Sequence, residues 1–111
     1  MRNKYNAIKT IIDGIKFDSK KEAGRYLELK ELQKLEKIII IELQPKFLLQ
    51  DGFKHNGKAI RAINYIADFS YHDISSGKLI IEDVKGIQTD VFKLKHKLFL
   101  FKYPDIILRL I

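Results

Sequence analysis

Two aspartates and a lysine are the residues of this sequence whose types and spacing could hold a metal ion. Asp68 lies in the segment Tyr65–Tyr71, and Asp83 and Lys85 flank Val84 further along the chain. Two carboxylates and one ammonium group suit Mg²⁺, which takes oxygen ligands and commonly binds through one or two carboxylates plus a phosphate. The cation can polarise the phosphate and lower the pKa of a bound water, which Lys85 can help to position. This pattern predicts metal-assisted attack of water on a phosphate ester.

A β-hairpin is the element that must bring these side chains together. Residues 65–71 and 79–84 are rich in aromatic and β-branched residues and are typical of strands. The segment between them, residues 73–78, has the composition of a turn. The two segments are therefore predicted to form an antiparallel pair.

The register of this hairpin decides which side chains meet. A loop at Ser75–Ser76 places Asp68 opposite Asp83, and a loop one residue later places it opposite Lys85. In both registers the three side chains share one face and Glu82 points to the other. A bulge or an odd loop would exchange Glu82 for Asp83. The alternative to a metal site is a cross-strand salt bridge on a solvated face.

Glu22 is a further acid with two open interpretations. Ser19–Glu22 has the pattern of a capping box at the start of a helix that is predicted to reach about Lys37. Capping alone accounts for Glu22. However, Glu22, Tyr26 and Leu29 fall at i, i+4 and i+7, so the carboxylate lies on the apolar face of the helix. An inward carboxylate needs a partner such as a cation, and a helix start can serve both roles.

The charge of the chain favours a polyanionic partner. The net charge is +7 and the pI is about 9.6, which suits nucleic acid. From Lys46 to Arg61 the chain has four basic residues and one acidic residue. This segment is expected to form a rim that contacts a nucleic-acid backbone.

A second helix is predicted from Asp90 to about Lys102, with Thr89 as its N-cap. Four apolar residues at helical spacing are expected to form its buried stripe: Val91, Leu94, Leu98 and Phe101. Three basic residues share another face: Lys93, His96 and Lys97. Ordinary solvation explains that face by itself, but the helix starts close enough to Lys85 for the face to flank a bound phosphate.

Length and composition are those of one soluble domain, residues 1–111, expected in the cytoplasm. Hydrophobic residues make up 46% and charged residues 32% of the chain, as in globular rather than disordered proteins. The absence of cysteine excludes disulfides and thiolate metal sites. No apolar run approaches the length of a membrane span, and the first residues lack the apolar core of a secretion signal.

The remaining segments complete an α/β fold with a mixed central β-sheet and two main flanking helices. A final strand is expected within residues 105–111, parallel to the Asp83 strand through a helical crossover. The other predicted elements are a tight hairpin around Asp13–Gly14, strands at Lys37–Leu43 and Lys46–Gln50, and a loop or hairpin tip at Asp51–Lys58.

The order of these elements and acids resembles the PD-(D/E)XK nuclease superfamily. The residues that carry the resemblance are Glu22, Ala67–Asp68 and Asp83–Val84–Lys85. A longer set of segments looks like a group of small phage and prophage proteins regarded as nucleases of this fold, over nearly the whole chain. That set comprises residues 5–7, 13–19, 22–23, 44–47, 65–69, 83–86 and 93–97.

The resemblance implies a restriction-endonuclease-like core and a role for each matching residue. Asp68 and Asp83 would be metal ligands together with the Val84 carbonyl, Glu22 a further acidic ligand or water contact, and Lys85 the catalytic lysine. The implied cofactor is Mg²⁺, for which Mn²⁺ can substitute. Ala67 stands at the usual Pro position. Asp83 stands at the usual Glu position directly after Glu82, so which acid binds the metal stays open.

The function that follows is a metal-dependent DNA endonuclease that hydrolyses phosphodiester bonds in a bacterial host. Small members of the superfamily include Holliday-junction resolvases, which act as dimers, so branched DNA is the first substrate by analogy. A homodimer is implied as well, although no exposed apolar helix face is expected. The alternatives are a less selective nicking or repair nuclease and an inert DNA-binding module of the same fold.

Overall fold

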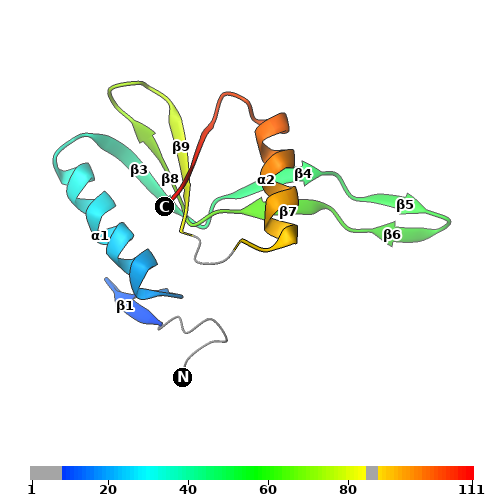
Figure 1. Ribbon diagram of the computed structural model, residues 1–111, viewed down its shortest axis with the longest axis horizontal. Helices are drawn as coiled ribbons and strands as arrows, with labels where there is room; N and C mark the ends of the chain where they lie inside the picture. Colours follow the sequence, from blue (N-terminus) through cyan, green and yellow to red (C-terminus); the bar gives the residue numbers. More distant parts are fainter. Residues whose placement is uncertain (1–8, 85–87) are drawn as a thin grey trace.

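The computed structural model describes residues 9–84 and 88–111, which form a mixed α/β structure around a central sheet (Figure 1). The helices are α1 (Lys20–Lys34) and α2 (Asp90–Lys102). The strands are β1 (Thr10–Ile12), β2 (Ile15–Phe17), β3 (Ile38–Leu43), β4 (Lys46–Gln50), β5 (Phe53–His55), β6 (Lys58–Ile60), β7 (Ile63–Ile66), β8 (Phe69–Asp73), β9 (Leu79–Asp83) and β10 (Ile107–Leu110).

The central sheet has the strand order β10-β9-β8-β3. β8 pairs antiparallel with both β9 and β3, whereas β10 lies parallel to β9. The chain passes from β9 to β10 through α2, so the predicted helical crossover is confirmed. Figure 1 shows α2 as the helix of this crossover.

The two faces of the sheet carry two separate cores because alternate strand residues point in opposite directions. Ile80 of β9 belongs to a cluster with Tyr26 and Leu29 of α1. Its neighbour Ile81 belongs to a cluster with Phe92 and Phe99 of α2. The two helices therefore cover opposite faces of the sheet.

The hairpin register agrees with the one predicted for a loop at Ser75–Ser76. Phe69 pairs with Glu82, and Tyr71 pairs with Ile80. The next position along each strand brings Asp68 level with Asp83. The Asp68 N–H donates to the Glu82 carbonyl at 3.0 Å, which holds the two strands together up to this point.

The segment predicted as one strand over residues 65–71 is broken at Ala67–Asp68. There the Ala67 N–H donates to the Pro45 carbonyl at 3.1 Å, and the Gln44 N–H donates to the Asp68 carbonyl at 3.0 Å. The facing strand is broken at Gln44–Pro45, where Gln44 has φ 49° and Pro45 has no N–H to give to a ladder. The pairs β3/β8, β4/β7 and β5/β6 follow one another and form a long two-stranded ribbon, here called the ribbon. Both strands of the ribbon therefore bend at the same level.

Beyond this bend the ribbon continues as β4 and β7 and then as β5 and β6. Figure 1 shows this end of the ribbon extending far from α1. Residues 51–58, predicted as a loop or hairpin tip, form the tip of a hairpin. Its turn is Asn56–Gly57, with φ values of 49° and 77°, as a type I′ turn requires.

Two helix predictions need correction. The first helix ends at Lys34 rather than near Lys37, because Glu36 adopts φ 58° and the Lys37 N–H turns back to the Leu32 carbonyl. The predicted buried stripe of α2 is wrong: the exposed fractions are 63% for Val91, 60% for Leu94, 37% for Leu98 and 89% for Phe101.

A second apolar row on α2 is buried in place of the predicted one. Phe92 and Phe99 face the sheet, where Phe99 packs against the rings of Tyr65, Phe47 and Tyr103. Large aromatic rings gain more from burial than aliphatic side chains do, so this row sets the rotation of the helix. The expectation that no apolar helix face is exposed is therefore wrong for α2.

Candidate metal centre at the end of the central sheet

Asp68 and Asp83 come together where β9 ends and the ribbon bends. Asp83 is the last residue of β9 and is fully buried. The Asp68 carboxylate accepts a hydrogen bond from the Val84 N–H at 2.6 Å. The Asp83 carboxyl lies close enough to Asp68 to raise the pKa of the Asp68 carboxyl. The end of the sheet therefore holds two acids near each other.

The surroundings of Asp68 make its carboxyl a weaker acid. Burial raises the pKa of the Asp68 carboxyl to about 7, the Val84 N–H opposes the rise, and the carboxyls of Asp83 and Glu22 add to it. A negative charge close by disfavours the ionised form of Asp68 in a partly buried site. A cation beside Asp68 would favour its ionised form.

Tyr65 fixes the position of Asp83. Its hydroxyl donates to Asp83 Oδ2 at 2.5 Å, and its ring is buried in the cluster with Phe99. Burial, followed by the interaction with Asp83, raises the pKa of Tyr65 above its ordinary value, so the phenol stays protonated as a donor. No role for Tyr65 was predicted from the sequence, although Tyr65 lies in the same predicted strand segment as Asp68.

Glu22 lies close to this pair. Its backbone N–H donates to Ser19 Oγ at 3.1 Å, which is the capping contact that the sequence predicted. Its side chain lines a cavity of about 130 Å³ together with Asp68, Gln44 and Phe17. Both interpretations of Glu22 thus have a structural basis, because a capped helix start directs its carboxylate toward Asp68.

The arrangement offers two carboxylates rather than a cage of acids. Within residues 9–84 and 88–111, no group of three or more His, Asp or Glu side chains could hold a metal ion. A pair of carboxylates nevertheless fits Mg²⁺, which keeps several waters and completes its shell with substrate phosphate. Val84 is half-buried beside the pair, and Lys85 lies outside the described residues.

Glu82 has a different environment, which bears on the choice between Glu82 and Asp83. It is fully buried on the α1 face, where Nε and Nη2 of Arg25 each donate to its carboxylate at 2.6 Å. The Tyr71 hydroxyl donates to the same carboxylate. The bond to Glu82 raises the pKa of Arg25 above its ordinary value. Asp83 is therefore the acid that the hairpin sets beside Asp68.

Arg25 was missed by sequence reasoning, although a signal for it exists. It lies three residues after Glu22 and four before Leu29, which places it on the inward face of α1. An arginine within an apolar helical stripe indicates a buried acid on the facing sheet. Glu82, in an otherwise apolar strand, is that acid.

The basic residues predicted to contact nucleic acid lie on three parts of the molecule. Lys46 is exposed at the start of β4, and Arg61 is exposed after β6. Lys93 and Lys97 are exposed on α2, whereas His96 is half-buried and stacks on Phe92 with ring centroids 5.7 Å apart. The lysines are therefore accessible, and one face of the imidazole is covered.

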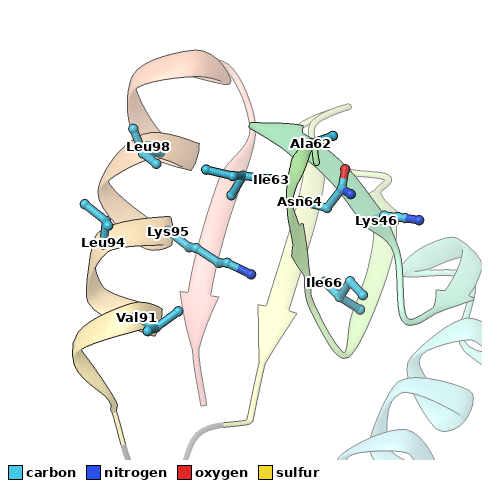
Figure 2. A pocket seen from close by; sticks show the side chains of 9 residues that line it. All are labelled: Lys46, Ala62, Ile63, Asn64, Ile66, Val91, Leu94, Lys95 and Leu98. Carbon is cyan, nitrogen blue, oxygen red and sulfur yellow. The ribbon is translucent and has the colours of Figure 1, made fainter. Parts of the chain in front are cut away.

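A wider groove of about 530 Å³ lies between α2 and the ribbon, and it does not include the acid pair. Figure 2 shows Lys95 extending from α2 across this groove. Its lining is mainly apolar and consists of Val91, Leu94, Leu98, Ile63, Ile66 and Ala62, with Lys46, Asn64 and Lys95. The exposed α2 stripe forms one wall of it.

Comparison with known proteins gives a family for the chain. Residues 2–111 match the model of a family described as Protein of unknown function (DUF1064). The chain belongs to this family. No curated protein and no solved structure matches it.

The DUF1064 match spans every residue of the candidate centre and the whole ribbon. In the part of this DUF1064 protein that the structure describes, neither helix has the length and apolar character needed to cross a membrane.

Proposed function

We propose that this DUF1064 protein is a metal-dependent DNA endonuclease with a restriction-endonuclease-like core, related to the PD-(D/E)XK nucleases. The observation that carries the proposal is the convergence of Asp68 and Asp83 at the end of the hairpin, where burial and the neighbouring Asp83 raise the pKa of Asp68 to about 7. Two neighbouring carboxyl groups, one of them with a raised pKa, suit a site that binds a divalent cation. The mixed sheet, with one helix on each face, supports the same family relationship.

Each residue of the centre has a proposed role. Asp68 and Asp83 would hold Mg²⁺ or Mn²⁺ with the Val84 carbonyl, and the cation supplies Lewis acidity and a more acidic bound water. The Val84 N–H orients Asp68, and the Tyr65 hydroxyl orients Asp83. Glu22 contacts water on the cavity side of Asp68.

The remaining roles follow from the sequence. Lys85, next to Val84 in the chain, positions the attacking water and offsets negative charge on the phosphate. Lys46, Arg61, Lys93 and Lys97 contact phosphates along the bound strand, as their exposure permits. We propose branched DNA, in particular a four-way junction arising in phage DNA processing, as the first substrate to test.

The test is a cleavage assay with three substrates: a four-way junction, a linear duplex and a single strand. We expect the junction to be cut with Mg²⁺ or Mn²⁺ and to stay intact with EDTA. Asp83→Asn should abolish cutting, and Asp105→Asn, the same change at an exposed acid, should cut as the unmodified protein does. Equal cutting of all three substrates would favour a less selective nuclease. Binding without cutting under both metals would contradict the proposal and leave an inert module.

A further inference from the structure

We infer that the hairpin formed by β5 and β6, here called the arm (residues 51–62), enters a groove of double-stranded nucleic acid about one helical turn from the acid pair. This inference rests on the proposed function, since it names the form of nucleic acid that the same centre receives. It goes beyond the backbone-contacting rim expected from the sequence, because it places the arm, with Lys54 and Lys58, inside a groove of a duplex.

The shape of the arm suits a groove. Every residue from 50 to 62 is exposed, and Figure 1 shows the arm as the far end of the ribbon. At its base the two strands approach closely, since a Cβ on Gly52 would lie 3.1 Å from the Ile60 carbonyl oxygen. A two-stranded β-ribbon fits the major groove of B-form DNA, which is about 12 Å wide. The arm therefore has the dimensions of a groove reader.

The side chains of the arm suit nucleic acid in particular. His55 pairs with Lys58 at the tip, and Phe53 pairs with Ile60 two positions back, so these four side chains share one face. Lys54 lies on the opposite face. Phe53 and Ile60 are 49% and 39% exposed. Cations at the tip can reach phosphates while apolar side chains contact base edges such as the thymine methyl group.

Charge complementarity favours a polyanion over a protein partner. The arm carries Lys54, Lys58 and Arg61, with Asp51 as its acidic residue. Charged residues are depleted in the cores of protein interfaces, and lysine in particular is under-represented there. A basic ribbon is instead typical of surfaces that bind nucleic acid.

The distance between the arm and the acid pair sets the length of duplex that both can contact. The ribbon leaves the bend beside Asp68 at Lys46 and reaches the tip at His55. Nine steps of about 3.3 Å give a span of roughly 30 Å. One turn of B-form DNA is about 34–36 Å, or about 10 base pairs. A duplex of about 8 base pairs, roughly 27 Å long, is too short to occupy both places.

The experiment measures binding by fluorescence anisotropy in EDTA, on duplexes from 8 to 30 base pairs in length and on a single strand. The arm variant is Lys54→Ala/Lys58→Ala. The matched control is Lys34→Ala/Lys37→Ala, which removes the same charge from exposed positions at the end of α1. For the 30-base-pair duplex we expect the Kd of the arm variant to rise about tenfold and its salt slope to fall by about 2. The Kd and the salt slope of the control variant should change less, because Lys34 and Lys37 lie outside the arm.

Duplex length separates the arm from general electrostatics. Duplexes of about 8 base pairs and the single strand should bind equally to both variants, and the affinity of the unmodified protein should rise once the duplex exceeds one turn. Equal binding of the long duplex by both variants would overturn the inference. The inference would also be overturned if the arm variant lost as much affinity for the single strand as for the long duplex. It would be overturned as well if the arm variant lost self-association while its affinity for DNA stayed unchanged. Arm-dependent duplex binding without any metal-dependent cutting would contradict the nuclease proposal alone.

Discussion

Glu82 and Asp83 are neighbours on β9 and are both fully buried, yet their carboxylates have opposite surroundings. Glu82 faces α1 and receives two hydrogen bonds from the Arg25 guanidinium. Asp83 faces the other way, where it accepts a hydrogen bond from the Tyr65 hydroxyl and lies near enough to Asp68 to raise its pKa. One face of the strand thus supplies a cation to its acid, and the other supplies a second acid.

The difference favours a structural role for Glu82 and the proposed ligand-binding role for Asp83. A buried carboxylate bound by an arginine in bidentate geometry is electrostatically complete. A half-buried acid with a raised pKa beside a buried acid destabilises the folded chain at neutral pH, and such arrangements are typical of functional sites. We therefore propose that Arg25–Glu82 stabilises the fold and that Asp68–Asp83 binds a cation.

Removing the arginine should have the largest effect on stability. Arg25→Ala leaves the Glu82 carboxylate buried without its guanidinium, so we expect the free energy of unfolding to fall by about 3 kcal/mol. This loss lies at the lower end of the range of about 3–5 kcal/mol for breaking a buried ion pair, because the Arg25 side chain is 18% exposed. Urea denaturation measures the change.

The double variant Arg25→Met/Glu82→Leu is the control for that prediction. It removes both charges and keeps apolar volume, so most of the lost stability should return. A urea midpoint of Arg25→Ala equal to that of the unmodified protein would show that the pair does not stabilise the fold.

The corresponding change at the acid pair should affect activity instead. We expect Asp68→Asn to lower the rate of metal-dependent cutting at least about 100-fold, equivalent to about 2.7 kcal/mol in the barrier. The fold should persist at pH 8, because the amide removes a buried negative charge. Single-turnover cleavage and thermal melting are the two measurements. If Asp68→Asn melted at a lower temperature than the unmodified protein and still cut DNA at the normal rate, Asp68 would serve the fold and not cation binding.

The acid pair should also make stability depend on pH. The folded-state pKa of Asp68 is about 7, above the value of about 3.9 for an unfolded chain. The folded protein therefore binds more protons between these values, and its stability falls as the pH rises from about 4 to 7. Because Asp68 is partly exposed, we expect a loss of about 1–2 kcal/mol by pH 8.

That loss is measured in EDTA as the difference between the unmodified protein and Asp68→Asn, so that the histidine contributions cancel. Added Mg²⁺ should restore stability at pH 8 in the unmodified protein alone. Parallel stability curves for the two proteins from pH 4 to 8 would contradict the raised pKa.

The smallest effect is expected at the basic face of α2. Lys97→Ala should weaken DNA binding by less than about 1 kcal/mol and reduce the salt slope by about 1, because Lys97 is exposed and its proposed contact is with phosphate alone. Cleavage at saturating DNA should stay unchanged. A large loss of the cutting rate at saturation would place Lys97 in the chemical step.

Local pattern was enough to predict the hairpin that forms the centre. The alternation of side chains and the turn at residues 73–78 predicted that Asp68 and Asp83 share one face, and left two registers open. The structure has the register that brings Asp68 level with Asp83. The Asp13–Gly14 turn is confirmed for the same reason, with φ values of 53° and 75°.

Tertiary packing decided the features that the sequence could not predict. Two apolar rows on α2 have helical spacing, so the spacing alone cannot tell which row is buried. Contact with Tyr65 and Phe47 buries the row that contains Phe99. The break at Ala67–Asp68 depends on Gln44–Pro45 across the ribbon, a partner that is distant in sequence. The Arg25–Glu82 pair is likewise a contact between separate elements.

The most direct test of the acid pair as a cation site is a crystal structure with Mn²⁺, located by its anomalous scattering. The account predicts one strong peak within about 2.0–2.3 Å of carboxylate oxygens of both Asp68 and Asp83, and its loss in Asp83→Asn. A peak elsewhere on the chain, or none at millimolar Mn²⁺, would contradict it.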